Sequence, residues 1–289
     1  MADNGHKAGV QAITRPQRFR GSGPILLLAA LFVIASFLAW YFTWFGRSLS
    51  DQDISSYLDD EKHPRHVQHA LFQIELRMEK GDASVARWYP RIISLSKSSE
   101  TEFRLTVSWL MGFDNRSQEF HEALLQLLHD PEPIVRRNAA LALVRFGDNS
   151  GHEELQSVLR TYVVTASVDG VVQSTLKEGA GVSRGTLLAR IEQPNGTVTE
   201  LRSPLPGSIK RIVAADQPKV SSGSEVVQLD SDEQSVWETL RGLALIGSSE
   251  DLALIGKYKT HGSSRKIREQ AALTLNAIQN RSESKDIKP

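Results

Sequence analysis

The stretch DPEPIVRRNAALALVRFG, residues 130–147, places apolar side chains at Val135, Ala139, Leu143 and Phe146. Steps of four, four and three residues return to one face of an α-helix, which has about 3.6 residues per turn. Asp130-Pro131 precedes the pattern and Gly147 follows it, and both are helix boundary signals. The stretch therefore predicts an amphipathic helix with one buried face.

The same pattern returns in SSRKIREQAALTLNAI, residues 263–278, through Ile267, Ala271, Leu275 and Ile278. TEFRLTVSWLMG (101–112) is a looser copy, and VQHALFQIEL (67–76) is a possible earlier one. An arginine follows the first apolar position in three copies, as Arg104, Arg136 and Arg268. Shorter amphipathic segments lie between the copies, so the chain contains an internal helical repeat.

Alternating helices with these Asp-Pro, Val-Arg and Ala-Ala-Leu elements resemble HEAT repeats, most closely at 130–147 and well at 249–278. The resemblance implies an α-solenoid, whose stacked helix pairs offer extended surfaces to protein partners. We expect helical repeats at 52–161 and 231–280, followed by a disordered tail at 281–289. An ordinary amphipathic bundle would show the same apolar face and is the alternative.

The spacing of the copies predicts an insertion. Comparable helices are expected to begin near residues 99, 131, 231 and 263. The two outer steps are then equal (131 − 99 and 263 − 231), whereas the middle step (231 − 131) is about three times as long. One ordinary step accounts for part of the middle step, and the excess is as long as the segment 162–230. We therefore expect a separate domain at 162–230, inserted within one helical hairpin.

Residues 162–230 have the composition of short strands, with Val, Ile, Thr and Ser at alternating positions and Gly and Pro between them. The segment also repeats within itself. DGVVQSTLKEGAGVSRGTLLARIE (169–192) aligns with PGSIKRIVAADQPKVSSGSEVVQLD (206–230), so that Gly170 matches Gly207 and Val182 matches Val220. Two equivalent β halves are predicted.

This two-fold pattern resembles the barrel-sandwich hybrid domains of biotinyl and lipoyl proteins and of bacterial membrane fusion (periplasmic adaptor) proteins. LKEGAGVSRGTLLARIE (176–192) is the part most similar to the adaptor family. Laid on a lipoyl domain, Asn195 takes the position of the modified lysine within Pro194-Asn195-Gly196. An asparagine amide is not a nucleophilic amine, so we expect no prosthetic group there. Asn-Gly instead favours a two-residue type I′ hairpin turn and a possible interaction tip.

The N-terminal region contains no charged residue from Gly21 to Gly46. A helix of about 20 apolar residues can cross a bilayer, so we expect a transmembrane helix at 24–46 after a basic cytoplasmic tail at 1–23. Basic residues precede the segment, and an aromatic cluster ends it. The predicted localisation is the inner (cytoplasmic) membrane, with a cytoplasmic N-terminus and the bulk of the chain periplasmic. A cleaved signal peptide is the alternative.

Candidate chemistry is sparse. The chain has no cysteine, which excludes disulfides and thiolate ligands. His63, His66 and His69 recur every three residues and could share one side of a helix around a metal ion. A solvated helix face is the favoured interpretation of these histidines. No motif of an enzyme is present, and the net charge of zero gives no basic surface for nucleic acid.

Together these patterns predict an α+β multidomain chain. It would have an N-terminal transmembrane helix and a HEAT-like α-solenoid interrupted by a small all-β barrel-sandwich hybrid domain. The favoured function is a membrane-anchored, non-enzymatic scaffold without cofactors, bound to the lipid bilayer and to protein partners. The resemblance to adaptor proteins suggests an accessory role in an export or efflux complex. The alternatives are a regulatory module that binds a small ligand or cofactor, and a structural subunit of an energy-transducing membrane complex.

Overall fold

The computed structural model describes residues 22–44, 48–215 and 218–286. The chain divides into two units, 1–50 and 51–289, which are described separately. The first contains one helix, α1 (Ser22–Trp44). Its large apolar side chains between Leu26 and Leu38 are exposed within the structure.

The predicted transmembrane helix at 24–46 is contradicted. Within the described part of the chain, no helix has both the length and the apolar character that crossing a membrane requires. The predicted inner-membrane localisation and the bilayer as a partner lose their support for the same reason. Four basic residues carried the predicted orientation, and they lie outside the described residues: Lys7, Arg15, Arg18 and Arg20.

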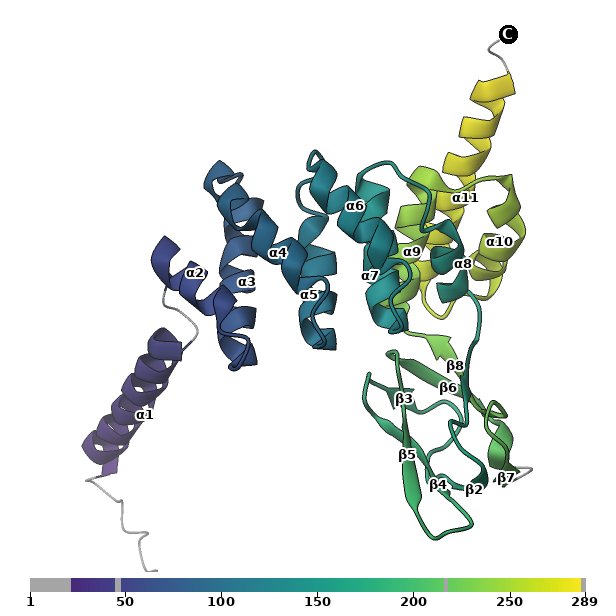
Figure 1. Ribbon diagram of the computed structural model, residues 1–289, viewed down its shortest axis with the longest axis horizontal. Coiled ribbons are helices and arrows are strands. Elements are labelled where there is room, and N and C mark those ends of the chain that lie inside the picture. The colour runs from purple at the N-terminus through teal and green to yellow at the C-terminus, as the bar shows by residue number, and fades with distance from the viewer. Residues whose placement is uncertain (1–21, 45–47, 216–217, 287–289) are drawn as a thin grey trace, which may run out of the picture. The chain divides into compact units, whose positions relative to one another are not determined.

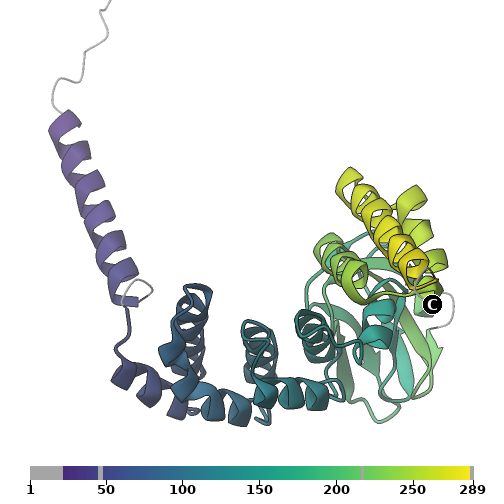
Figure 2. The ribbon, with the colours of Figure 1, turned by 90° about the horizontal axis from the view of Figure 1, so that it is seen from above.

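The second unit contains ten helices within its described residues, and Figure 1 shows how they follow one another. Consecutive helices pair as α2 with α3, α4 with α5, α6 with α7, α8 with α9, and α10 with α11, and the second members of these pairs stack on one another. Figure 2 shows the helices from above. Their bounds are α2 (Asp51–Asp59), α3 (Pro64–Glu79), α4 (Tyr89–Leu95), α5 (Thr101–Met111), α6 (Gln118–Leu127), α7 (Pro133–Arg145), α8 (His152–Val158), α9 (Glu233–Ile246), α10 (Leu252–His261) and α11 (Arg265–Asp286).

The helix starts reproduce the spacing expected from the sequence. Helices α5 and α7 begin at Thr101 and Pro133, and helices α9 and α11 begin at Glu233 and Arg265. The two outer steps are again equal (133 − 101 and 265 − 233), and the middle step (233 − 133) is the same as the one predicted. Each helix begins slightly later than expected, by the same small offset. Helix α11 continues to Asp286, beyond residue 280, where the helical repeats were predicted to end.

The repeated arginine has one role in three copies, because it satisfies a carbonyl of the loop that leads into its own helix. Arg104 Nη1 donates to Ser98 O at 2.9 Å, and Arg136 Nη1 donates to Asp130 O at 2.8 Å. Arg268 Nη1 makes the same bond to Gly262 O at 2.8 Å. A buried carbonyl without a partner costs stability, so the arginine secures the turn between the two helices of a pair.

Neighbouring repeats are joined by ion pairs from two of these arginines. Arg104 Nε donates to the buried Asp130 carboxylate at 2.6 Å, across to the loop before α7. The hydrogen bond to Asp130 raises the pKa of Arg104 above its ordinary value. Arg136 makes the next contact, from Nε to Glu154 Oε2 of α8 at 3.1 Å. The repeats are therefore connected in series by contacts between adjacent units.

Strands replace helices between α8 and α9, as expected, but they form two small antiparallel sheets. The strand orders are β1-β8-β6-β3 and β5-β4-β2-β7. The predicted single barrel is thus wrong, because no pairing among the described residues closes the two sheets on each other. The bounds are β1 (Tyr162–Thr165), β2 (Gly170–Gln173), β3 (Gly181–Val182), β4 (Leu187–Glu192), β5 (Val198–Arg202), β6 (Gly207–Ile212), β7 (Lys219–Val220) and β8 (Glu225–Ser231).

Strands of the two halves of the β region pair with each other at equivalent positions. Gly170 in β2 pairs with Val220 in β7, and Gly207 in β6 pairs with Val182 in β3. These are the residues that the internal sequence repeat aligns. Each glycine lies against a backbone carbonyl, and an added Cβ would approach Glu192 O to 2.5 Å at Gly170. Glycine is therefore required where a strand of one half meets the other half.

Helices on both sides of the β region share one apolar core. Leu155 and Leu159 precede the strands, whereas Leu240 and Leu243 follow them, and all four are buried in the same cluster. Each fully buried leucine contributes about 1.5–3 kcal/mol through removal from water. Packing of this kind holds α8 beside α9 although the whole β region separates them in the chain.

Candidate functional site

A groove lies along the first helices of two neighbouring repeats, α4 and α6, with a volume of about 810 Å³. Its apolar floor includes Ile93 and Leu127. Its rim carries the exposed carboxylates of Glu119 and Glu122, and Lys97 also lines it. The groove therefore combines apolar surface with acidic side chains exposed at its edge. Sequence reasoning missed it, because no motif marks a gap between two packed helices.

An aromatic contact joins the two helices, α4 and α6, that flank this groove. The rings of Tyr89 in α4 and Phe120 in α6 lie 4.1 Å apart between centroids. Tyr89 Oη donates to Asp114 Oδ2 at 2.9 Å. Burial and this hydrogen bond raise the pKa of Tyr89 far above its ordinary value of 10.0, so the phenol stays protonated and remains a donor. Phe120 is also oriented from the backbone, since its N–H donates to the Ser117 hydroxyl at the start of α6.

The hairpin tip at Pro194, Asn195 and Gly196 differs from the predicted two-residue turn. Gln193 N donates to Thr197 O at 2.8 Å, and Gly196 N donates to Gln193 O at 2.9 Å. Three residues thus form the loop, with Gly196 at a φ of 81°, an arrangement in which only the last residue requires positive φ. Asn195 Oδ1 accepts from Thr197 N at 2.9 Å and closes the loop.

No lysine stands at this tip, as the sequence states. Lys210 lies in β6, where its Nζ donates to Thr161 Oγ1 at 2.6 Å. Lys177 is exposed in the turn that precedes β3. Neither lysine lies at the tip that a lipoyl domain modifies. The absence of a prosthetic group stays a prediction.

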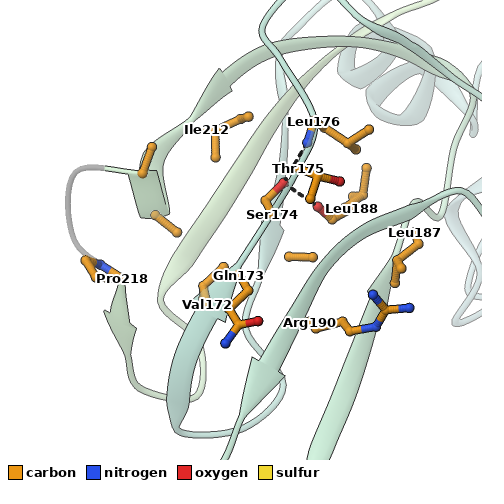
Figure 3. A pocket seen from close by; sticks show the side chains of 13 residues that line it. Val172, Gln173, Ser174, Thr175, Leu176, Leu187, Leu188, Arg190, Ile212 and Pro218 are labelled. Carbon is orange, nitrogen blue, oxygen red and sulfur yellow. Dashed lines mark hydrogen bonds between the residues drawn. The ribbon is translucent and has the colours of Figure 1, made fainter.

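A second cavity, of about 370 Å³, lies in the β region beside β2 and β4 (Figure 3). Much of its lining is apolar, including Val172, Leu188 and Ile212. Its Ser174 hydroxyl is already engaged, because Oγ donates to Leu188 O at 2.7 Å and accepts from Leu176 N at 3.3 Å. Polar side chains of Gln173, Thr175 and Arg190 line the same cavity.

The three histidines that the sequence offered as metal ligands have different surroundings. His63 and His66 lie together with Asp60, whose carboxylate contacts both rings. His69 is outside this cluster, and its Nε2 is buried without a hydrogen-bond partner in the structure. Burial, together with the nearby His66, lowers the pKa of His69 below its ordinary value of 6.5. Asp60 precedes the histidine triplet together with Asp59 and Glu61, but none of these carboxylates is fixed beside the histidines by the sequence, so Asp60 was not predicted as a member.

A buried hydrogen-bond network joins the helices on the two sides of the β region. The fully buried Asp251 accepts from His152 Nε2 at 2.8 Å and from Gln156 Nε2 at 2.7 Å, both in α8. It also accepts from Ser248 N at 2.8 Å. Tyr258 Oη donates to Leu159 O at 3.0 Å and adds a second connection. The partners on the two sides lie far apart in the chain, so no local pattern predicts them.

Arg137 is a further buried charged residue that the sequence did not reveal. It is 4% exposed, and none of its three guanidinium nitrogens has a hydrogen-bond partner in the structure. Burial lowers its pKa, while the charges of Glu154, Tyr162 and Asp232 act in the opposite direction. Arg137 therefore lies near residues at which the chain enters and leaves the β region, Tyr162 and Asp232.

Comparison with known protein families agrees with the helical part of this structure. Residues 89–177 match the family description HEAT repeats. The match contains the groove, the Arg104–Asp130 pair and helices α5 to α8, which confirms the predicted HEAT-repeat character of this segment. HEAT repeats indicate a scaffold for protein interactions. A search among curated proteins finds no match to the chain.

Proposed function

We propose that this protein is a non-enzymatic scaffold that binds a basic segment of a partner protein in the groove between α4 and α6. The observation that carries the proposal is this groove, of about 810 Å³, within the segment that matches HEAT repeats. Stacked helix pairs use such surfaces to bind proteins. The packed walls around Tyr89 and Phe120 mean that the groove is formed before a partner arrives.

The chemistry of the groove selects the partner. Glu119 and Glu122 are exposed at its rim, whereas the carboxylate of Asp130 is occupied by Arg104. Exposed carboxylates beside apolar surface fit a segment with Lys or Arg next to apolar residues. Charges at the rim would guide association and fix the register of the partner, while the apolar floor would supply burial.

A non-enzymatic role is supported by the way in which two partly buried His–Asp pairs are used. His121 Nε2 contacts Asp148 Oδ2 at 2.6 Å, and His152 contacts Asp251. Within the described residues, neither imidazole has a hydroxyl group as a hydrogen-bond partner. A nucleophile within hydrogen-bond reach is the usual requirement for acyl-transfer chemistry on a His–Asp pair. Both pairs instead connect helices.

Site-specific photo-crosslinking from Gln126, which lines the groove, tests the proposal in cells. We expect one predominant crosslinked protein whose crosslinked peptide is rich in Lys or Arg. The double variant Glu119→Lys/Glu122→Lys should abolish this crosslink. The matched control Glu250→Lys/Glu283→Lys changes the net charge equally at exposed positions outside the groove and should retain it. Equal loss in both variants, or an acidic crosslinked peptide, would contradict the proposed groove.

A further inference from the structure

We propose that Asp60, His63 and His66 form a binding site for Zn²⁺ at the first helical pair of the second unit. One ligand atom from each of the three residues can be chosen so that all lie within 4.8 Å of one another. They come from the turn after α2 and the start of α3. The site is independent of the groove between α4 and α6.

The local backbone brings the three side chains to one side of the turn. His63 N donates to Asp60 O at 3.0 Å, and His66 N donates to His63 O at 2.8 Å. Pro64 is the first residue of α3, and its fixed φ favours a helix start there. Successive steps of three residues then place Asp60, His63 and His66 next to one another.

Both imidazoles present the same nitrogen to the carboxylate. His63 Nδ1 lies 2.9 Å from each oxygen of Asp60, and His66 Nδ1 lies 2.7 Å from Oδ2. His66 is held in this orientation by Tyr57 of α2, because the two rings stack with centroids 4.4 Å apart and an angle of 15° between their planes. The two Nδ1 atoms thus lie within hydrogen-bond distance of the same carboxylate.

The donor set selects the metal. Imidazole nitrogen and carboxylate oxygen suit Zn²⁺, whereas Mg²⁺ and Ca²⁺ prefer oxygen ligands alone. Zinc–ligand bonds of about 2.0–2.2 Å in a tetrahedral centre keep the ligand atoms about 3.3–3.6 Å apart. The nitrogens must therefore move away from the carboxylate by about half an ångström to admit the ion. Side chains exposed by 66% at His63 and 44% at His66 can make this movement.

The bound ion would tie the end of α2 to the first turn of α3. Repeat proteins need a secured terminal repeat, because its outer face has no neighbour in the stack. Three protein ligands leave a fourth position, which water or a group from a partner protein can occupy. The inferred role of the ion is to stabilise this terminal helical pair.

Isothermal titration of the full-length chain with ZnCl₂ tests the site. We expect one saturable equivalent of Zn²⁺ per chain, a rise of the melting temperature on binding, and no binding of Mg²⁺ at the same concentrations. Co²⁺ in place of Zn²⁺ should give the visible absorption of a four-coordinate centre. Because each variant removes one ligand, Asp60→Asn and His66→Asn should each weaken Zn²⁺ binding by about tenfold or more.

His261→Asn is the matched control, since it removes an exposed histidine whose Nδ1 contacts the neighbouring Thr260 hydroxyl. It should leave the binding of Zn²⁺ unchanged. Circular dichroism checks that all three variants keep their helical content. Absence of saturable Zn²⁺ binding in the unaltered chain would overturn the proposal. Stoichiometric binding that survives both Asp60→Asn and His66→Asn would overturn it as well.

Discussion

The helical pairs α6–α7 and α8–α9 are packed alike but connected very differently. Helix α7 begins at Pro133, soon after α6 ends at Leu127. Helix α8 ends at Val158 and α9 begins at Glu233, so the whole β region lies between them. Both pairs nevertheless make direct helix–helix contacts. The comparison teaches that the interhelical core, rather than the length of the connection, holds α8 and α9 together. The Asp251 network adds a connection from α8 to the segment between α9 and α10.

The largest expected effect comes from truncating the shared core on either side of the β region. Leu155→Ala and Leu240→Ala each remove a fully buried side chain from the same cluster. We expect each to lower the free energy of unfolding by about 2–5 kcal/mol. Urea unfolding followed by circular dichroism measures both, and a single transition in each variant would show one cooperative unit. Two separate unfolding transitions, with only one midpoint shifted in a given variant, would show that the helices on the two sides of the β region do not unfold as one unit.

The next effect concerns the ion pairs that join consecutive repeats. Asp130→Asn leaves Arg104 without its charged partner in a site where the two side chains are 11% and 4% exposed. A hydrogen bond to a charged group contributes about 1.5–3 kcal/mol, and we expect a loss of that size in urea unfolding. Glu154→Gln should cost less, because its pair with Arg136 is more exposed. Glu269→Gln, in an exposed pair within α11, is the control and should cause no measurable loss.

The Asp251 network makes the contact between α8 and the segment that joins α9 to α10 dependent on pH. Burial alone would raise the pKa of Asp251, but hydrogen bonds from His152, Gln156 and Ser248 outweigh it and lower the pKa below the ordinary 3.8. A carboxyl group with a lowered pKa in the folded state adds stability above its unfolded pKa. That stability is lost as the pH falls through the folded pKa.

We therefore expect Asp251→Asn to flatten the acid limb of the stability profile. Urea unfolding between about pH 5 and pH 3 should show a steeper loss of stability in the unaltered chain than in the variant. Glu283→Gln removes an exposed carboxylate of α11 and serves as the control that keeps the steep profile. Parallel profiles for Asp251→Asn and the unaltered chain would mean that this network does not hold α8 against the segment between α9 and α10.

The smallest expected effect is at the hairpin tip. Asn195→Ala removes one hydrogen bond, to Thr197 N, at an exposed position. We expect the free energy of unfolding to change by less than about 0.5 kcal/mol. Intact mass of the purified chain should show no lipoyl or biotinyl addition. A loss well above this value would mean that the tip packs against other residues, and an adduct would contradict the predicted absence of a prosthetic group.

Local and periodic features of the fold were accessible from the sequence. The helix starts at Thr101, Pro133, Glu233 and Arg265 follow from a buried face that returns at a constant interval on each side of the β region. The equivalent positions of Gly170 and Gly207, each of which pairs with a strand of the other half, follow from the two aligned β halves. In each case a repeated pattern restricts the backbone within a short segment, so residue order alone is informative.

Features that depend on distant partners were not accessible. In the sequence, Asp251 looks like any acidic residue near the start of a helix. Its partners His152 and Gln156 lie far earlier in the chain, in α8. The tip at 194–196 was predicted with one residue too few in the loop, since Asn-Gly occurs in more than one hairpin type. The apolar segment at 24–46 predicted a membrane span that the described helices do not supply. The proximity of Asp60 to His63 and His66 depends on the structure of the turn between α2 and α3, which the sequence alone did not give.

Deletion of residues 163–230 tests most directly whether α8 and α9 form one helical pair across the β region. The ends of the deleted segment are close, because Thr161 Oγ1 donates to Asp230 Oδ1 at 2.8 Å and Tyr162 pairs with Leu229. A short Gly-Ser linker can therefore replace it. We predict a protein with reduced β signal in circular dichroism, retained helical signal and one cooperative thermal transition. Loss of that transition, with residues 47–160 folding well alone, would show that the helices before and after the strands are separate domains.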